Sequence, residues 1–431
     1  MAELRKRLRV AFATLGCKAN QYESGRLAAE FAERGCEVVP ADSPCDVLIV
    51  NTCTVTNVAE SKSRAKLRRL KREHPNAVLV AAGCSAEINP DSLSPLADLL
   101  VPNTGKAGLV DFVLAHRGLS LPILTEDAVP ANVQTARLPS LGRTRSLLMI
   151  QDGCEDRCTY CIIPTARPVV SSRPADDVLR EASALADKGY KEIVLTGISI
   201  GSWRDGNRRL SSLLKALAGT AGIERIRLSS IEPRTVTDSL LKVFAEESAL
   251  CRHLHIPLQS GDDGVLADMG RTYNTQAYRT LIHNVRKRLP DAGIATDVVV
   301  GFPTETDESF ERTLRFCEEM DFCKIHVFPF SPRAGTPAAA MRDIVGSKTR
   351  KERTARLIEI SDSGVRRWAE NAVNSTVVVI AEPKDGKGRH SGLTSNGVRV
   401  MWPSRMDMTG HLVTVRITGT EHGTAFGEAV P

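Results

Sequence analysis

The sequence has no apolar run long enough to cross a membrane, and this absence is the first limit on what the chain can be. Its first residues, MAELRKR, are charged and have no apolar core of the kind that secretion signals carry. We therefore expect a cytoplasmic protein with no membrane partner. Hydrophobic residues make up 42% and charged residues 25% of the 431 positions, which is typical of a folded chain with two or three domains.

Disulfides are not expected either, although the chain has 11 cysteines. The cytoplasm keeps thiols reduced, and an odd number of cysteines agrees with metal ligation or with buried thiols. Three of them, Cys154, Cys158 and Cys161, are separated by three and then two residues. No fourth Cys or His lies within about the next thirty residues.

This incomplete set of ligands favours one kind of metal site over others. A structural zinc ion takes four protein ligands, and a ferredoxin-type cluster also takes four thiolates. Three cysteines on one loop after the apolar residues 147–150 therefore indicate a [4Fe–4S] cluster with one iron open to a small molecule. Two alternatives stay open, a zinc site completed from elsewhere in the chain and a redox pair formed by Cys158 and Cys161.

A second trio of cysteines is predicted from the strand pattern of the N-terminal segment. Apolar runs at residues 9–14, 47–50 and 78–82 alternate with helical patterns, which predicts an open, mostly parallel α/β sheet. Cys17, Cys53 and Cys84 each follow one of these runs, so they should meet at the carboxyl edge of the sheet. Cys36 and Cys45 should lie at the opposite end. The alternative is three unrelated buried cysteines.

The rest of the chain predicts two further domains. Six strand–helix repeats between about residues 145 and 370 indicate a partial (β/α)6 barrel, whose site would lie at the carboxyl ends of its strands. The final residues are rich in short strands separated by turn residues, which predicts a small antiparallel β-barrel of the OB-like kind. The fold class is therefore α/β with a β-rich tail, and the predicted domains are residues 1–125, 140–370 and 372–431.

Motifs in both cysteine regions resemble those of the radical S-adenosylmethionine (SAM) methylthiotransferase family over nearly the whole chain. An aromatic residue, Tyr160, stands before the last cysteine of the loop, as in radical SAM enzymes. The matching runs, in order, are TLGCKANQYE (14–23), NTCTVTN (51–57), GC (83–84), QDGC (151–154), SSIEP (229–233), HIPLQSG (255–261), TDVVVGFP (296–303) and SPRAGTP (331–337).

The resemblance implies two [4Fe–4S] clusters and SAM as cofactors. Cys154, Cys158 and Cys161 would hold the cluster that binds SAM and releases a 5′-deoxyadenosyl radical. Cys17, Cys53 and Cys84 would hold a second cluster that carries sulfur, and the tail would be an RNA-binding TRAM domain. The implied partners are a tRNA anticodon stem-loop, an electron donor such as a flavodoxin-type protein, and the iron–sulfur assembly machinery.

Further residues are expected to contact SAM because they lie at or just beyond strand ends, although capping of loops explains them equally well. They are Gly197, Ser230, Glu232, Gln259, Arg271 and Asp297. Tyr160, beside the last cysteine of the loop, is also expected to contact the cofactor. Arg167 and Arg173 could meet a phosphate or the SAM carboxylate. A structural role outranks metal ligation for His253 and His255.

The form of the first motif resembles the branch that acts on threonylcarbamoyladenosine beside the tRNA anticodon and gives its 2-methylthio derivative. The same chemistry on isopentenyladenosine, or on an aspartate of a ribosomal protein, is the nearest alternative. A non-catalytic RNA-binding protein with two zinc-like sites is an alternative of a different class. Seven cations at residues 62–72 predict either a solvated helix face or a surface that contacts phosphates.

Overall fold

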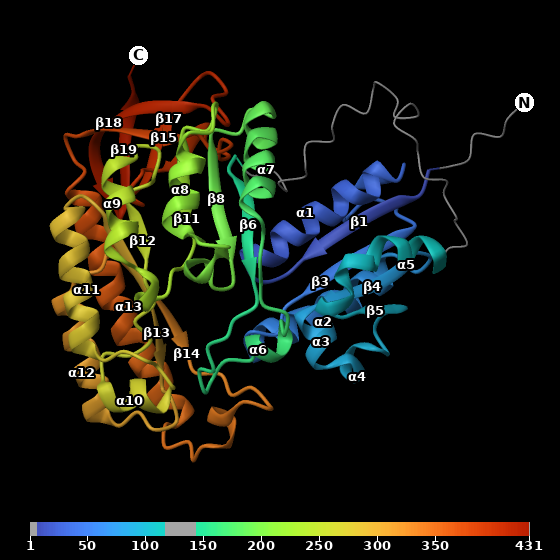
Figure 1. Ribbon diagram of the computed structural model, residues 1–431, viewed down its shortest axis with the longest axis horizontal. Helices are drawn as coiled ribbons and strands as arrows, with labels where there is room; N and C mark the ends of the chain where they lie inside the picture. Colours follow the sequence, from blue (N-terminus) through green and yellow to red (C-terminus); the bar gives the residue numbers. More distant parts are fainter. Residues whose placement is uncertain (1–6, 117–143, 431) are drawn as a thin grey trace, which may run out of the picture. The chain divides into compact units, whose positions relative to one another are not determined.

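The computed structural model describes residues 7–116 and 144–430 (Figure 1). The predicted boundary between the first two domains, at residues 125–140, lies outside these ranges. By its contacts the chain divides into two compact units. The first unit contains the N-terminal segment with Gly153–Asp156 and Cys161–Val170, and the second contains most of the remaining chain. No helix in the described ranges is long and apolar enough to cross a membrane.

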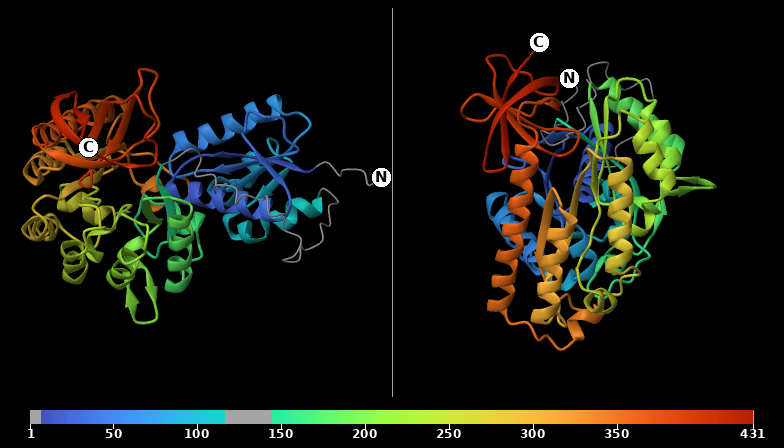
Figure 2. Two further views of the ribbon diagram at one scale, coloured as in Figure 1. Left: turned by 90° about the horizontal axis from the view of Figure 1, so that it is seen from above. Right: turned by 90° about the vertical axis from the view of Figure 1, so that its left-hand side faces the viewer.

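A five-stranded sheet with strand order β2-β1-β3-β4-β5 forms the centre of the first unit, and every neighbouring pair is parallel. Its strands are β1 (Arg9–Thr14), β2 (Glu37–Val39), β3 (Val47–Thr52), β4 (Val78–Gly83) and β5 (Leu99–Val101). Every residue of β3 is buried because helices cover both faces of the sheet, which Figure 2 shows in its left-hand view. The predicted open parallel α/β fold is confirmed.

The two faces of this sheet pack against different helices because successive strand residues point to opposite sides. One core contains Val10, Ile49 and Val80 with side chains of α1 (Lys18–Glu33) and α5 (Leu109–His116). The other core contains strand residues such as Leu48 with side chains of α2 (Asn57–Glu73), α3 (Cys84–Ile88) and α4 (Pro90–Leu93). A 3-10 helix, η1 (Asn103–Gly108), precedes α5.

Six parallel strands form the barrel region of the second unit, as predicted. They are β6 (Ser146–Asp152), β8 (Glu192–Gly197), β11 (Arg225–Leu228), β12 (His253–His255), β13 (Gly293–Val300) and β14 (Lys324–Pro329). Hydrogen bonds join β6, β8 and β11 in one sheet and β12, β13 and β14 in another. A single bridge between Ile226 and Leu250 lies between the two sheets.

Long helices alternate with these strands, and shorter elements lie in the loops. The long helices are α7 (Ala175–Asp187), α8 (Leu210–Ala218), α9 (Asp238–Glu246), α11 (Thr275–Arg288), α12 (Asp307–Met320) and α13 (Ser347–Glu370). The shorter elements are α6 (Ile163–Ala166), α10 (Asp263–Asp268), η3 (Ile200–Ser202), η4 (Pro233–Thr235), η5 (Pro337–Ala340), β7 (Ser171–Ser172), β9 (Arg204–Asp205) and β10 (Arg208–Arg209).

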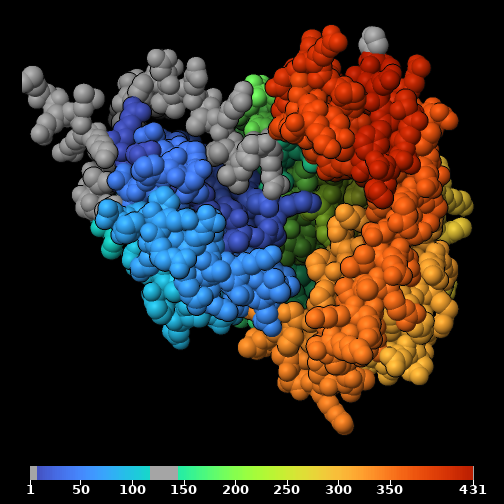
Figure 3. Space-filling view, turned by 180° about the vertical axis from the view of Figure 1, so that it is seen from behind, coloured from blue at the N-terminus to red at the C-terminus, as the bar shows by residue number. Residues whose placement is uncertain are grey.

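The C-terminal part is a five-stranded sheet with strand order β15-β18-β19-β17-β16. Its strands are β15 (Thr376–Ile380), β16 (Arg389–Leu393), β17 (Arg399–Pro403), β18 (Leu412–Glu421) and β19 (Thr424–Ala429). The sheet is mixed, because β17 and β19 are parallel while the other pairs are antiparallel as predicted. Figure 3 shows this part in red beside the orange surface that includes α13, with which β18 and β19 are in contact.

The turn between β16 and β17 lies against the amino ends of the barrel strands. Arg225 of β11 donates two hydrogen bonds of 3.2 Å to the carbonyl of Leu393, and Arg227 donates one of 2.9 Å to that of Thr394. Both guanidinium groups also pair with the buried Glu192 of β8, at 3.2 and 2.9 Å. The C-terminal sheet is therefore fixed to this end of the barrel region.

Candidate functional site

Cys17, Cys53 and Cys84 lie at the carboxyl edge of the N-terminal sheet. Cys17 follows β1 and is the N-cap of α1, Cys53 follows β3, and Cys84 is the first residue of α3 directly after β4. These three strands are parallel neighbours, so their carboxyl ends share one edge. The structure thus brings this trio to one place.

Two glycines allow the strand ends to pack closely beside the thiols. Gly16 has φ +94°, and a Cβ atom there would lie 2.7 Å from the sulfur of Cys53. Gly83 has φ +100°, and a Cβ atom there would lie 2.5 Å from the side-chain oxygen of Asn51. Only glycine adopts this backbone conformation readily and also avoids the collision that a Cβ atom would cause here. This explains why a glycine directly precedes Cys17 and Cys84.

The thiols affect one another electrostatically. Burial, and to a smaller extent the neighbouring Cys17 and Cys84, raise the pKa of Cys53 to about 11. The Cys17 residue is exposed as a whole, but protein atoms around its sulfur desolvate the thiol, and this desolvation raises its pKa. Arg167 acts in the opposite direction on both Cys17 and Cys53.

Cys36 and Cys45 lie at the other end of the sheet, as predicted. Cys36 precedes β2 and Cys45 precedes β3, so both are at amino ends of strands. Burial raises the pKa of Cys36 to about 11. Neither residue belongs to the trio.

A buried cluster of three charged side chains, Glu23, Lys106 and Arg167, lies close to the first trio of cysteines. Arg167 is only 2% exposed and donates to both carboxylate oxygens of Glu23, at 2.7 and 3.1 Å. Lys106 is also buried and pairs with Glu23. Burial alone would raise the pKa of Glu23, but the two cations lower it to about 2. The Arg167 guanidinium binds Glu23 and Asn20, and its expected contact with a phosphate or with SAM stays a prediction.

Asparagine side chains connect this cluster to the strand ends. Asn20 is fully buried, accepts a 2.8 Å bond from Arg167, and donates to the carbonyls of Leu15 and Thr52 at 2.8 and 2.9 Å. Asn103 of η1 donates to the sulfur of Cys84 at 3.2 Å. Asn103 was not predicted, since it belongs to no motif and follows Cys84 by nineteen positions without a helical or strand spacing that would relate them.

The loop that carries the other three cysteines contributes to both compact units. Cys154 and Cys161 are grouped with the first unit, and Cys158 is grouped with the second. In the first unit, the backbone N–H of Asp156 donates to the sulfur of Cys154 at 3.4 Å. Gly153 has φ +72°, and a Cβ atom there would lie 2.5 Å from the carbonyl oxygen of Val169.

In the second unit, Arg271 lies beside Cys158. Its Nη1 donates to the Cys158 sulfur at 3.1 Å, its other Nη pairs with Glu232, and its Nε donates to the hydroxyl of Tyr273 at 3.2 Å. Burial alone would lower the pKa of Arg271, but Tyr273 and Glu232 raise it above its usual value. Glu232, in the loop after β11, and Arg271, which follows α10 and not a strand as expected, are thus brought together. Tyr273 was not predicted.

Asp297 lies on the inner face of the barrel region. Its Oδ1 is 2.8 Å from Nε2 of His255, and the ring of His255 stacks on that of His326 with centroids 5.1 Å apart. The preceding residue, Thr296, is buried and contacts Tyr278 of α11, so Asp297 must point away from the helices. His255 is therefore a polar neighbour of a predicted SAM contact.

The structure places the remaining predicted SAM contacts, Gly197, Gln259, Tyr160 and Ser230, in different surroundings. Gly197 ends β8, where a Cβ atom would lie 2.5 Å from the carbonyl oxygen of Gln151. Gln259 has φ +69°, which is uncommon for a residue other than glycine, and its backbone bonds to Asp297 and Val299. Tyr160 packs on the core around Phe302. Ser230 lies in the loop after β11.

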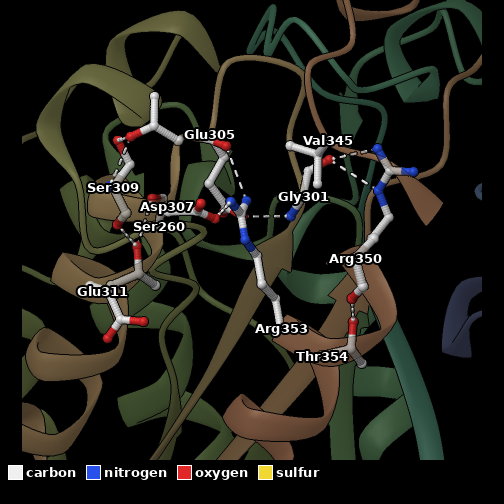
Figure 4. Close-up of polar contacts among 12 residues, drawn as sticks. Ser260, Gly301, Glu305, Asp307, Ser309, Glu311, Val345, Arg350, Arg353 and Thr354 are labelled. Atoms are coloured by element: carbon white, nitrogen blue, oxygen red, sulfur yellow. Dashed lines mark hydrogen bonds and ion pairs between the residues drawn. The ribbon is translucent and has the colours of Figure 1, made fainter. Parts of the chain in front are cut away.

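Helix α13 holds the turn after β13 (Figure 4). Arg353 donates to Oε1 of the buried Glu305 at 2.6 Å, and the same oxygen accepts the N–H of Gly301 at 2.9 Å. Arg350 donates to the carbonyl of Gly301 at 3.1 Å. These bonds keep the end of β13 in place, on the strand that carries Asp297.

Within residues 7–116 and 144–430, no three His, Cys, Asp or Glu side chains form a group that could hold a metal ion. A four-iron cluster binds each thiolate through a different iron, so its ligands are spread more widely than those of one ion. The donor set fits such a cluster in its chemistry: three thiols share one sheet edge, and Asn103 directs an N–H at one of their sulfurs.

Comparison with known proteins agrees with both regions of the chain. The family model "Radical SAM superfamily" matches residues 148–317, and "Uncharacterized protein family UPF0004" matches residues 9–101. A solved structure of the radical S-adenosylmethionine methyltransferase TsrM from Kitasatospora setae has a TM-score of 0.57 at 14% identity, covering 94% of this chain and 84% of that one. This likeness concerns the fold.

Relatives that match nearly the whole chain show which kind of radical SAM enzyme it resembles. "Threonylcarbamoyladenosine tRNA methylthiotransferase MtaB" of Bacillus subtilis is 38% identical over 95% of this chain and 93% of its own length. The Thermotoga maritima protein of the same name is 36% identical over 89% and 88%. "tRNA-2-methylthio-N(6)-dimethylallyladenosine synthase" of Thermodesulfovibrio yellowstonii is 30% identical over 97% of both chains. The chain therefore belongs to the methylthiotransferase family of radical SAM enzymes.

Proposed function

We propose that this chain converts N6-threonylcarbamoyladenosine beside the anticodon of tRNA into its 2-methylthio derivative. The observation that carries the proposal is the 38% identity, over 95% of the chain, with a relative named for that reaction. The motif at residues 16–23, GCKANQYE, supports the same branch. Dimethylallyladenosine, also called isopentenyladenosine, is the second candidate substrate, because synthases named for it are 30–32% identical.

Two [4Fe–4S] clusters and SAM are the proposed cofactors. Cys154, Cys158 and Cys161 hold the cluster that binds SAM, and their spacing and the match to the radical SAM superfamily support this role. Cys17, Cys53 and Cys84 hold the second cluster, which their shared sheet edge supports. When bound, these groups supply a carbon-centred radical, a sulfur atom and a methyl group.

The side chains around the cysteines have separate tasks in this proposal. Glu23, Arg167 and Lys106 hold the first trio in place by a buried ion cluster. In the second unit, the ends of the barrel strands surround SAM and keep water away from it. The residues proposed there are Tyr160, Gly197, Ser230, Glu232, Gln259 and Asp297.

The three predicted domains divide the work. Residues 1–125 carry the second cluster, residues 140–370 carry SAM chemistry, and residues 372–431 bind RNA in the manner of a TRAM domain. In the last of these, Trp402 is fully buried and stacks on His390, so it belongs to the core and does not stack on bases. RNA contact there depends on exposed polar and charged residues.

The proposed partners follow from the reaction. A tRNA anticodon stem-loop is the substrate, and a reduced electron donor such as a flavodoxin-type protein supplies electrons. The iron–sulfur assembly machinery loads the clusters. Because tRNA is found in the cytoplasm, we expect the protein to act there.

Mass spectrometry of tRNA nucleosides tests the substrate. Cells that lack the gene should lose 2-methylthio-N6-threonylcarbamoyladenosine and accumulate its precursor, and the intact gene should restore the product. Loss of the methylthio group from dimethylallyladenosine instead would favour the second candidate. Loss from neither nucleoside would direct attention to a ribosomal-protein aspartate.

Metal content and two cysteine variants test the cofactors. Anaerobically prepared protein should be brown and contain about eight irons, from two four-iron clusters. A colourless protein that binds zinc in air would support the RNA-binding zinc protein instead. Cys158→Ala should abolish SAM cleavage, whereas Cys53→Ala should leave some uncoupled cleavage and stop thiolation. Equal loss in both variants would contradict separate roles.

A further inference from the structure

One sulfur in each cysteine trio accepts a hydrogen bond from a side chain outside its own loop. Arg271 donates to Cys158 at 3.1 Å, and Asn103 donates to Cys84 at 3.2 Å. The two donors differ in charge, since a guanidinium is a cation and an amide is neutral. This difference bears on how readily each cluster would accept an electron.

Arg271 is held rigidly in this position. Its side chain is 5% exposed, and its guanidinium is fixed on two sides by Glu232 and by the Tyr273 hydroxyl. The guanidinium carbon also lies 5.0 Å from the centre of the Tyr273 ring. Tyr273 in turn donates to the backbone carbonyl of Leu258 at 2.9 Å, which anchors the pair to the loop after β12.

A donor fixed at a thiolate ligand changes the energy of electron transfer to the cluster. Reduction adds negative charge to the iron–sulfur core and its thiolates, and an N–H···S bond stabilises that charge. Hydrogen bonds to sulfur and the local charge are among the factors that set cluster potentials. A cation in a buried site has a stronger effect than a neutral amide at the same distance.

We propose that Arg271 is a positioning residue that raises the reduction potential of the cluster held by Cys154, Cys158 and Cys161, through its hydrogen bond to Cys158. The direct SAM contact expected of Arg271 from the sequence stays a separate prediction. The inference rests on the proposed function, because it requires a cluster at these cysteines.

A redox titration of a single cluster tests the inference. The full chain with Cys17, Cys53 and Cys84 all replaced by Ala is reconstituted anaerobically, and its electron paramagnetic resonance signal is followed against potential without SAM. Arg271→Met should move the midpoint to a more negative value. Arg271→Lys, which keeps the charge but loses the planar fork, should give a smaller shift in the same direction.

Matched controls separate this effect from a general loss of charge. Arg356→Met removes a cation of α13 from its exposed pair with Glu311 of α12 and should leave the midpoint unchanged. Asn103→Leu in the same single-cluster chain should also leave the midpoint unchanged, because Asn103 donates to Cys84 and not to Cys158. An Arg271→Met midpoint that is unchanged without SAM, or that moves only when SAM is present, would overturn the proposal.

A second variant decides the matter if Arg271→Met fails to fold or to bind iron. Tyr273→Phe keeps the ring and removes the hydroxyl that holds Nε of Arg271, so it should shift the midpoint in the same direction by less. An iron-loaded Tyr273→Phe protein with the unchanged midpoint would refute the inference. If the parent chain itself binds no cluster at this trio, the proposed function fails, and that result is read from iron content before any titration.

Discussion

At the scale of single residues, Glu23 shows how one buried carboxylate can serve two distant segments. It lies on α1, yet it pairs with Lys106 of η1 and with Arg167 after α6. Removing one member of a buried ion cluster leaves the others without a counter-charge, which destabilises a protein more than the loss of a surface pair does.

Glu23→Gln should therefore reduce the free energy of unfolding by about 3–5 kcal/mol at pH 7, because two buried cations lose their counter-charge. The pKa of Glu23 is lowered from 4.5 to about 2 in the folded chain. Its contribution is present above pH 4.5 and is lost as the pH falls through 2, so wild type and variant should converge over that range. Thermal unfolding of iron-free protein at pH 7 and pH 3 measures both effects, and a constant difference between the two curves would contradict this account.

Gln259 offers a residue-scale test of strain and function. Its φ of +69° places the Gln259 backbone in the left-handed region, which is strained for a residue other than glycine. Backbone strain of this kind often accompanies a functional site. Gln259→Gly should keep the stability of the protein within about 1 kcal/mol, because glycine adopts this conformation readily. The same variant should bind SAM more weakly, as measured by equilibrium binding to the reconstituted enzyme. Unchanged SAM binding would assign Gln259 to loop geometry alone.

At the scale of elements, strands were easier to predict than the contacts between them. Runs such as residues 47–50 and 78–82 are buried on both faces, so their apolar character alone marks β3 and β4. Strand β12 stops at His255, before Pro257, which has no N–H to donate to a sheet. The parallel pairing of β17 with β19 joins distant segments and has no local pattern, so the sequence predicted an antiparallel sheet there instead.

Helix α2 carries the basic residues 62–72, for which two interpretations can be tested. They form either a solvated helix face or a surface that contacts phosphates. Arg64 and Arg69 pair with Glu60 and Glu73 on the same helix, whereas Arg68 and Arg72 are exposed one turn apart. Replacing Arg68 and Arg72 together by Ala should weaken tRNA binding and reduce its salt dependence, because phosphate contacts release counterions. Filter binding at several salt concentrations measures this. Arg69→Ala is the control, and equal affinity of all three proteins would identify α2 as a solvated face.

At the scale of the whole molecule, the six candidate cysteines could be found from sequence because each trio has its own rule. One trio follows from spacing on a single loop, and the other from the shared carboxyl edge of parallel strands. Their partners could not be found in this way. Asn103 and Lys106 reach the first trio through contacts with residues distant in sequence, and no motif marks them. Tyr273 stands only two positions after Arg271, but it belongs to none of the matching motifs.

The attachment of the C-terminal sheet to the barrel region gives a prediction for the second unit. Arg227→Met removes the bonds to the carbonyls of Thr394 and Ser395 and leaves the buried Glu192 with fewer cations. We expect a loss of about 3–5 kcal/mol in the free energy of unfolding. Hydrogen exchange should quicken in residues 376–429 more than in β13. Uniform quickening across the second unit would show that the attachment is not local.

This attachment also has a consequence for the proposed binding of RNA by the C-terminal sheet. The sheet is fixed at the amino ends of the barrel strands, whereas Cys158 and Arg271 belong to loops at their carboxyl ends. Strand β13 has 8 residues and so spans about 26 Å. Under the proposed function, a nucleotide bound where the sheet is attached would lie roughly one strand length from a base that reacts near Cys158.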